Sequence, residues 1–311
     1  MELFKRETHI DFMGTRTLAL VLSGILIAAS IFALATRGLN LGIDFTGGVL
    51  IEVGYPQSVE LSEVLDVLEA GGFDKAVVQH FGTSHEVLVR LPPEEGREGG
   101  EVRDQIESEL KKTEPGIEMR RVEFVGPQVG EDLTEQGGLA MLFALMMIMA
   151  YIAFRFQWKF SIGAVAALVH DVIITLGVFS FTQLPFDLSV LASLLAVIGY
   201  SLNDTIVVFD RIRENFLKMR RASPVEVINA SVNQMLPRTL ITSFTTLLVL
   251  FSLYFLGGEA LVPFSIALII GIVVGTYSSI YIASAAALLL NVSTRDLLPP
   301  QRDDSEAGAI R

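Results

Sequence analysis

The stretch GYSLNDTIVVFDRIREN, Gly199–Asn215, begins inside a long apolar run and ends in a basic segment. Its Asn203 and Asp204 stand about two helical turns before the polar exit of that run. A carboxylate at the centre of a membrane helix costs roughly 2.5–3.5 kcal/mol on insertion scales, and less toward the ends. Folding alone gives little reason to retain such a group. We therefore treat Asp204 as a candidate functional residue whose partner lies elsewhere in the chain.

The composition is typical of a membrane protein. Of 311 residues, 51% are hydrophobic and 19% are charged, and there is no cysteine, which excludes disulfides and thiol chemistry. Residues 36–137 hold 21 acidic and 9 basic side chains, whereas the rest of the chain holds 14 of each. The chain therefore contains one acidic soluble region. Because phosphate contacts need a basic surface, nucleic-acid binding is not expected.

Six apolar runs have the length needed to cross ~30 Å of hydrocarbon. They are 17–35, 138–154, 161–181, 188–209, 239–256 and 261–290. We therefore predict an α-helical membrane protein with six transmembrane helices. The first run ends in Ala33-Leu34-Ala35, which resembles a signal-peptidase site, so cleavage is an alternative. Because this run is longer than the ~7–15 residues of a signal-peptide core, we predict a retained helix.

Lysine and arginine in the short loops predict the orientation in the membrane. Basic residues lie in the segments 1–16, 155–160, 210–238 and 291–311. The connections 182–187 and 257–260 contain none. By the positive-inside rule, both termini and the loop 210–238 are cytoplasmic, and the region 36–137 lies outside. Within that loop, apolar spacing over 225–235 predicts a short interfacial helix bounded by Pro224 and Pro237.

Residues 36–137 are predicted to form an α+β domain inserted between the first and second membrane helices. Strands are expected at 48–54, 76–81, 87–91 and 117–125, with one helix from a Ser58 cap to Gly71 and another at 102–112. The order β-α-β-β-α-β is the ferredoxin-like pattern. Both helices would cover one face of the sheet and leave the other available for docking. Such a fold does not define a function.

Glycines mark several candidate packing or hinge positions. These are Gly47 and Gly48, in a predicted tight turn at the membrane exit, and Gly199, Gly271 and Gly275, with Ser278 and Ser279 one turn after the last. Small residues of this kind let membrane helices approach closely. We interpret the Gly271–Gly275 stretch as a packing face.

Ionisable residues inside the apolar runs are the candidates for chemistry. They are His170 and Asp171 in the third run and Asp204 in the fourth, and Arg238 stands at the head of the fifth. A proton relay needs an acid that changes charge in a low dielectric and a cation that holds it ionised until the two part. Asp204 and Arg238 supply this combination if their helix ends meet, and His170-Asp171 offers a second titrating pair.

Each of these residues also has a purely structural interpretation. Arg238 next to Pro237 fits an interfacial anchor. His170 and Asp171 fit a hydrogen-bonded pair between helices, and Asp204 fits a structural ion pair. In the insert, His80 and His85 have no third ligand nearby in sequence, and the chain carries no P-loop motif. We therefore expect no metal, no cofactor and no enzymatic reaction.

Five stretches together resemble the SecD/SecF family of protein-export membrane proteins, within the resistance-nodulation-division superfamily. They are GIDFTGG (Gly42–Gly48), VGPQVGEDL (Val125–Leu133), the quoted Gly199–Asn215, LPRTLITS (Leu236–Ser243) and GIVVGTYSSIYIA (Gly271–Ala283). The resemblance extends over nearly the whole chain and implies a location in the bacterial inner membrane.

The resemblance also implies partners and a mechanism. The chain would pair with SecD to give twelve membrane helices, associate with the SecYEG channel and often with YajC and YidC, and use the proton-motive force to draw a translocating preprotein outward. It places Asp204 and Arg238 at the proton path and makes the insert a coupling or docking module. Two alternatives stay open: an assembly subunit whose acid is only structural, and half of a small-molecule proton antiporter.

Overall fold

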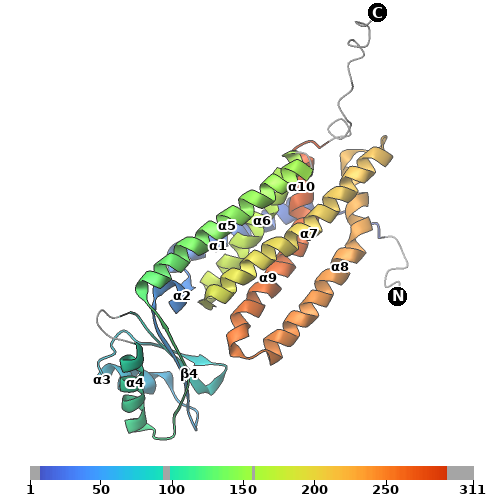
Figure 1. Cartoon of the computed structure of the whole chain (residues 1–311). Helices are drawn as coiled ribbons and strands as arrows, with labels where there is room; N and C mark the ends of the chain where they lie inside the picture. The colour runs from blue at the N-terminus through green and yellow to red at the C-terminus, as the bar shows by residue number, and fades with distance from the viewer. Residues whose placement is uncertain (1–7, 94–98, 156–157, 293–311) are drawn as a thin grey trace, which may run out of the picture.

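The structure is a computed structural model that describes residues 8–93, 99–155 and 158–292. Within these residues, six helices are long and apolar enough to cross a membrane, in agreement with the six predicted. They are α1 (Arg16–Arg37), α5 (Pro127–Arg155), α6 (Trp158–Thr182), α7 (Leu188–Lys218), α8 (Pro224–Leu256) and a last helix made of η1 (Glu259–Leu261), α9 (Val262–Ser278), the π-helical η2 (Ser279–Ala283) and α10 (Ser284–Leu289). They run side by side, with the insert at one end of the bundle (Figure 1).

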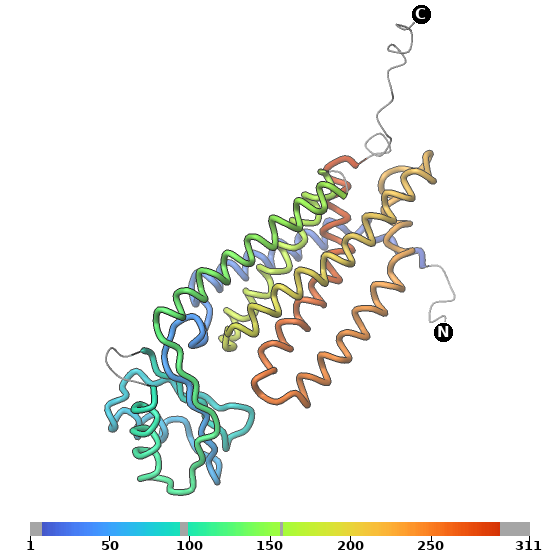
Figure 2. The backbone as a smooth tube through the Cα atoms, in the orientation of Figure 1, coloured from blue at the N-terminus to red at the C-terminus, as the bar shows by residue number. Residues whose placement is uncertain are grey.

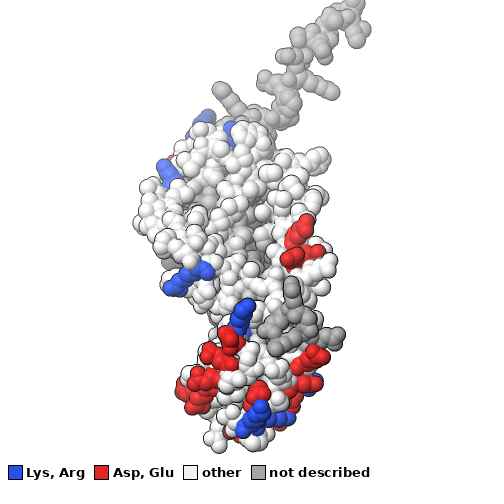
Figure 3. All heavy atoms as spheres, turned by 90° about the vertical axis from the view of Figure 1, so that its left-hand side faces the viewer, with Lys and Arg blue, Asp and Glu red and all other residues white. Residues whose placement is uncertain are grey.

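Helix α6 is the centre of the bundle. It packs against α1, α5, α7 and α9, and it is the most buried of the six membrane-length helices. Helices α5 and α8 lie at the outside and expose large apolar side chains such as Met147 and Phe244. Charged side chains gather over the insert, whereas the helical part of the visible face carries few (Figure 3). This distribution fits a bundle surrounded by lipid and an insert in water.

The fifth membrane helix is longer than predicted. Its described residues contain no separate interfacial helix, because α8 runs from Pro224 through Pro237 to Leu256 without a break (Figure 2). Ser223 and Glu226 form a capping box at its start, where Pro224 fits because the first helical N–H needs no partner. Pro237 removes the N–H that would bond the carbonyl four residues earlier.

The N-terminal segment compensates for that loss. The hydroxyl of Thr8 donates to the Asn233 carbonyl at 3.3 Å, which is the carbonyl that Pro237 leaves free. The Asn233 side chain also accepts from the Ile10 N–H at 2.9 Å and donates to the Ile10 carbonyl at 2.8 Å. Phe12 is buried behind these contacts. The segment before α1 is therefore fastened to the first half of α8, which the sequence did not indicate.

The insert follows the predicted order of strands and helices. Its elements are β2 (Gly48–Gly54), α3 (Leu61–Ala70), β3 (Val77–Phe81), β4 (Thr83–Leu91), α4 (Gly99–Thr113) and β5 (Glu118–Val125). The strands form one antiparallel sheet in the order β3-β4-β2-β5. Alternate residues Val49, Ile51 and Val53 face a core shared with both helices. Two local details differ from prediction: Glu60 rather than Ser58 is the N-cap of α3, and only Gly82 separates β3 from β4.

A tight junction joins the insert to the bundle. After α1, β1 (Asn40–Leu41) pairs in parallel with β6 (Pro185–Phe186), which precedes α7. The one-turn helix α2 (Ile43–Thr46) follows and leads into Gly47 and Gly48, at φ 69° and 120°. A Cβ on Gly48 would lie 2.1 Å from the Leu91 carbonyl oxygen. Only glycine fits there, because both the backbone conformation and the space exclude a side chain.

Candidate functional site

Asp204 lies in α7 with its side chain turned into the bundle. It is 4% exposed, and its Oδ2 is buried and accepts no hydrogen bond within the described chain. The neighbouring Asn203 is exposed. A buried carboxylate without donors is costly, since burial disfavours its charged form. The position therefore favours a carboxyl group that changes protonation state.

Arg238 lies near Asp204 on the adjacent helix α8. Its guanidinium exerts an electrostatic effect on the Asp204 carboxylate. The two groups nevertheless form no ion pair in the described structure, and Arg238 is exposed. The structure thus brings the two predicted partners within electrostatic range but leaves them apart. An attraction of this kind depends on how α7 and α8 are placed relative to each other.

Other polar atoms near these two residues also lack partners. Tyr200, one turn before Asp204, and Thr239, directly after Arg238, have buried hydroxyl groups without hydrogen bonds among the described residues. A buried polar group left unpaired costs about 1–3 kcal/mol. Unpaired groups therefore accompany both Asp204 and Arg238, a pattern that calls for a functional explanation.

His170 and Asp171 form a contrasting, closed arrangement in α6. Their side chains are 3% and 1% exposed, and His170 Nδ1 lies 2.9 Å from Asp171 Oδ1. The other carboxylate oxygen, Oδ2, accepts hydrogen bonds from Ser201 of α7 at 2.5 Å and from Ser278 of α9 at 2.8 Å. Both carboxylate oxygens of Asp171 are therefore paired.

The far side of His170 connects to α1. His170 Nε2 lies 3.1 Å from Ser23 Oγ, which lies 3.0 Å from the hydroxyl oxygen of Tyr277. Tyr277 donates to the carbonyl of Ala19 at 2.8 Å, and its ring stacks on His170 with the centroids 6.1 Å apart. The chain of hydrogen bonds therefore links four helices: α1, α6, α7 and α9.

The candidate glycines occupy different environments. A Cβ on Gly271 would lie 2.2 Å from Val197 of α7, and one on Gly275 would lie 3.0 Å from the Ser201 Cβ. These two glycines let α9 approach α7 closely enough for Ser278 to reach Asp171. Gly199 differs, because a Cβ there would meet nothing within 4 Å. The packing contact expected at Gly199 is not found.

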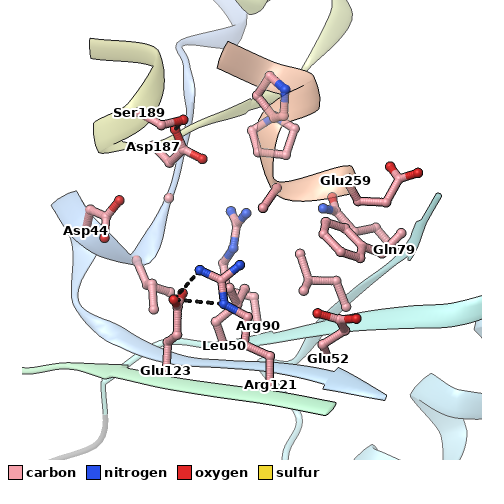
Figure 4. A pocket seen from close by; sticks show the side chains of 17 residues that line it. Asp44, Leu50, Glu52, Gln79, Arg90, Arg121, Glu123, Asp187, Ser189 and Glu259 are labelled. Atoms are coloured by element: carbon pink, nitrogen blue, oxygen red, sulfur yellow. Dashed lines mark hydrogen bonds and ion pairs between the residues drawn. The ribbon is translucent and has the colours of Figure 1, made fainter. Parts of the chain in front are cut away.

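The second face of the insert's sheet, predicted to be available for docking, is turned toward the bundle. It faces the ends of the helices across a cleft of about 220 Å³ lined by side chains of β2–β5, α2, α7 and η1 (Figure 4). Arg90 donates from one nitrogen to Asn40 Oδ1 at 2.9 Å and to the Leu41 carbonyl at 3.0 Å. Burial lowers the pKa of Arg90, and the nearby Asp187 opposes that effect. Arg90 therefore ties the sheet to β1.

Sequence reasoning missed the partners of the His170-Asp171 pair. Ser23, Ser201 and Tyr277 are uncharged residues in apolar runs, where single hydroxyl groups are common and often bond their own helix. The one available signal was Ser278, which follows the Gly271–Gly275 stretch by one turn. That stretch marked the close approach of two helices, although not the acid toward which Ser278 points.

Comparisons with known families agree on one group of proteins. Residues 105–293 match the family described as "Protein export membrane protein SecD/SecF, C-terminal", and residues 32–59 match the "SecD/SecF GG Motif". Among curated proteins, the chain is 53% identical to the protein translocase subunit SecF of Vibrio alginolyticus, covering 96% of both chains. It is 50% identical to the SecF subunit of Pseudomonas aeruginosa, covering 95% of this chain and 96% of the relative.

Solved structures show the same relationship. The crystal structure of SecDF, a translocon-associated membrane protein from Thermus thermophilus, matches with a TM-score of 0.85 and 39% sequence identity. The match covers 92% of this chain but 39% of that one, so this chain spans about two fifths of the SecDF chain. SecDF in a super-membrane-facing form matches with a TM-score of 0.70 and 38% identity, covering 93% of this chain and 40% of that chain.

Proposed function

Because the chain belongs to the SecD/SecF family of protein-export membrane proteins, we propose that it uses the proton-motive force to promote late stages of preprotein translocation. Its partner in this proposal is a SecD chain, which would supply the part of a SecDF-like assembly that this chain does not span. The assembly would act beside the SecYEG channel, with YajC and YidC as further associates. The preprotein, not a small molecule, is the cargo.

One observation carries the proposal: Asp204 is buried, its Oδ2 has no donor among the described residues, and Arg238, with which it forms no ion pair there, lies within electrostatic range. An ionised Asp204 attracts Arg238, and a protonated Asp204 does not. Proton binding would therefore change the preferred spacing of α7 and α8. A membrane potential contributes about 2.3 kcal/mol per elementary charge per 100 mV. Since 1.4 kcal/mol is a factor of ten, this field is large enough to bias a two-state element.

The insert would transmit this movement outside the cell membrane. We assign it to the ferredoxin-like fold, supported by its sheet order β3-β4-β2-β5, and to the extracytoplasmic side, supported by the basic residues of the opposite loops. Both termini are then cytoplasmic, in a bacterial inner membrane. Helix α7 starts immediately after β6, which pairs with β1 next to the insert. Movement of α7 therefore has a short route to the sheet.

The test is export by complexes that carry Asp204→Asn, which keeps the size of the side chain and removes its charge. Inverted membrane vesicles with equal amounts of assembled complex are compared for preprotein export with and without a proton-motive force. We expect export by the variant to lose its response to the force. The matched control is Asp210→Asn, on the same helix, whose carboxylate is exposed and should leave the response intact.

Two other functions make different predictions in this assay. If the chain only assembles the translocase, Asp204→Asn complexes export with an unchanged response to the proton-motive force. If it is half of a small-molecule antiporter, removing the chain leaves export unaffected while proton-dependent efflux of a dye is lost. Either result contradicts the proposal.

A further inference from the structure

The hydrogen-bond chain that ends at His170 has a direction that its geometry determines. A carbonyl oxygen only accepts, so the single hydroxyl hydrogen of Tyr277 is used on Ala19. Ser23 must then donate to the Tyr277 oxygen, 3.0 Å away. With its own hydrogen used, Ser23 accepts from His170 Nε2 at 3.1 Å. His170 therefore carries a proton on Nε2.

The opposite ring nitrogen then determines how many protons the pair holds. His170 Nδ1 and Asp171 Oδ1 are 2.9 Å apart, a distance that needs a hydrogen between them. With Nε2 already protonated, that hydrogen makes His170 an imidazolium beside a carboxylate, or Asp171 a carboxylic acid beside a neutral imidazole. Both forms hold the same number of protons and have no net charge. The pair thus holds one proton more than a neutral imidazole beside a carboxylate, and this extra proton is the stored proton of the site.

We propose that His170 and Asp171 form a second proton-binding site, in which the stored proton sets the direction of the hydrogen-bond chain to α1. The inference rests on the proposed function and deepens it, because it adds a proton site that contacts α7 one helical turn before Asp204. Ser201, which donates to Asp171, precedes Asp204 by three residues on α7. The site's ligand is a proton, and its acceptors are an imidazole and a carboxylate.

Loss of the stored proton reverses the direction of donation along the hydrogen bonds between His170, Ser23 and Tyr277. A neutral His170 has one N–H, and Asp171 requires it at Nδ1, because two lone pairs at 2.9 Å repel each other. Nε2 then becomes an acceptor for Ser23, and Ser23 accepts from Tyr277. One proton leaves to the medium, and each hydroxyl keeps one hydrogen. The Ala19 carbonyl loses the hydrogen bond from Tyr277, so α1 is held less firmly to α9.

Few other ionisable side chains stand near the serines that contact Asp171. Within two helical turns of Ser201 and Ser278 they are Tyr200 and Asp204 of α7, Tyr277 of α9 and Tyr281 of η2. Helix α1 carries no ionisable residue between its terminal arginines, and α10 carries none. Three donors remain on the Asp171 carboxylate after deprotonation: His170, Ser201 and Ser278. They stabilise the negative charge that the lost proton leaves behind.

The test is ¹⁵N nuclear magnetic resonance of histidine-labelled full-length protein, with its SecD partner, in lipid bilayers. The chain has four histidines, and the signals lost in His170→Gln belong to His170. Between about pH 5 and pH 8, we expect the proton on Nε2 to disappear while one hydrogen stays between Nδ1 and Asp171. An Nε2 whose protonation does not change over this range overturns the proposal.

The Ser23→Ala variant tests the direction of the hydrogen bond between His170 and Ser23. Ser23→Ala removes the acceptor of the Nε2 hydrogen in the protonated form and the donor to Nε2 in the deprotonated form. Only the deprotonated form then regains a bond, from Tyr277 to the Ala19 carbonyl, so the transition should move to lower pH by about half a unit or more. Ser265→Ala is the matched control, since Ser265 is a fully buried serine of α9 whose hydroxyl has no partner among the described residues. It should leave the transition unchanged. Equal shifts in the two variants contradict the proposed direction of the chain.

Failure of this inference is distinguishable from failure of the proposed function. Asp204→Asn should abolish the response of export to the proton-motive force while the His170 transition persists. If Asp204→Asn uncouples export and His170 shows no transition, only the second site is wrong. If His170 titrates as expected and Asp204→Asn exports normally, the function assigned to Asp204 is wrong.

Discussion

Asp171 and Asp204 are two buried acids in neighbouring parts of one bundle, and their surroundings are opposite. Both oxygens of Asp171 are paired, with donors from three helices. Oδ2 of Asp204 has no donor in the described chain, and its nearby cation stays unpaired. Ser201 connects the two environments, because it donates to Asp171 and stands one turn before Asp204.

The difference shows two ways in which a membrane bundle retains a carboxyl group. A carboxyl group whose two oxygens are both hydrogen-bonded holds helices together, and a change of its protonation redirects hydrogen bonds without breaking most of them. A buried carboxyl group with an oxygen that lacks a donor is costly in its charged form. Its charge therefore responds to protons and to the distance of a cation. In the proposed mechanism, protonation of Asp204 changes the spacing of α7 and α8, and protonation of the His170-Asp171 pair redirects the hydrogen bonds to α1. The following predictions test that contrast, from the largest expected effect to the smallest.

The largest effect on export is expected from substitution of Arg238. Arg238→Gln should reduce proton-driven export more than tenfold, because a buried acid that loses its cation loses its charge-dependent attraction. Arg238→Lys keeps the positive charge and should retain part of the activity. The measurement is the initial export rate in energised vesicles. Arg211→Gln, on the opposite side of the connection and paired with Glu214, is the control. Equal activity of the Gln and Lys variants would contradict an electrostatic role.

A stability comparison separates the two acids directly. Asp171→Ala leaves three donors without an acceptor and should destabilise the bundle by about 3 kcal/mol. Asp204→Ala removes a buried carboxyl group whose Oδ2 has no donor in the described chain, so stability should be unchanged or higher. Unfolding of the purified protein in detergent or bilayers measures both. Destabilisation by Asp204→Ala as large as that by Asp171→Ala would show that Asp204 is a structural ion-pair member.

The glycines that bring α9 to α7 should show a smaller effect. Gly271→Ala places a methyl group 2.2 Å from Val197, and overpacking of this kind costs about 1–3 kcal/mol. Gly199→Ala, with nothing near its Cβ, should be neutral or slightly stabilising, since alanine favours helix. Thermal unfolding of both variants is the measurement. A neutral Gly271→Ala would mean that the α7–α9 contact is looser than described.

The smallest effect is expected from single hydroxyl groups. Ser278→Ala removes one donor to Asp171, and hydrogen bonds between membrane helices contribute about 0.6 kcal/mol on average. Ser265→Ala removes a buried hydroxyl without a partner and should not destabilise the protein. The same unfolding assay compares them. Indistinguishable stabilities would show that the network around Asp171 adds little beyond packing.

Much of the fold was predictable because it depends on local patterns. Apolar runs of membrane length are continuous in sequence, and the alternation at Val49, Ile51 and Val53 marks a sheet with one buried face. The course of α8 through Pro237 was not predictable. The carbonyl that Pro237 leaves free accepts a hydrogen bond from Thr8, more than two hundred residues away, and no local pattern indicates that contact.

The candidate site was predictable only as single residues. An acid in an apolar run is conspicuous, so Asp204 and His170-Asp171 were identified from sequence alone. Which acid has both oxygens hydrogen-bonded depends on where the serines of α1, α7 and α9 lie. The rotation and crossing of the helices determine those positions. The separation of Asp204 from Arg238 is likewise a property of two packed helices. Sequence therefore identified the acids, and packing determined which of them has both oxygens hydrogen-bonded.

The most direct test asks whether Asp204 binds a proton. Infrared difference spectra of the assembled complex in bilayers, recorded between neutral and acidic pH, report the carbonyl stretch of protonated carboxyl groups. The account predicts a band that appears on acidification, is absent in Asp204→Asn and is present in Asp210→Asn. A spectrum that Asp204→Asn leaves unchanged would contradict the account, because proton binding would then take place at another group.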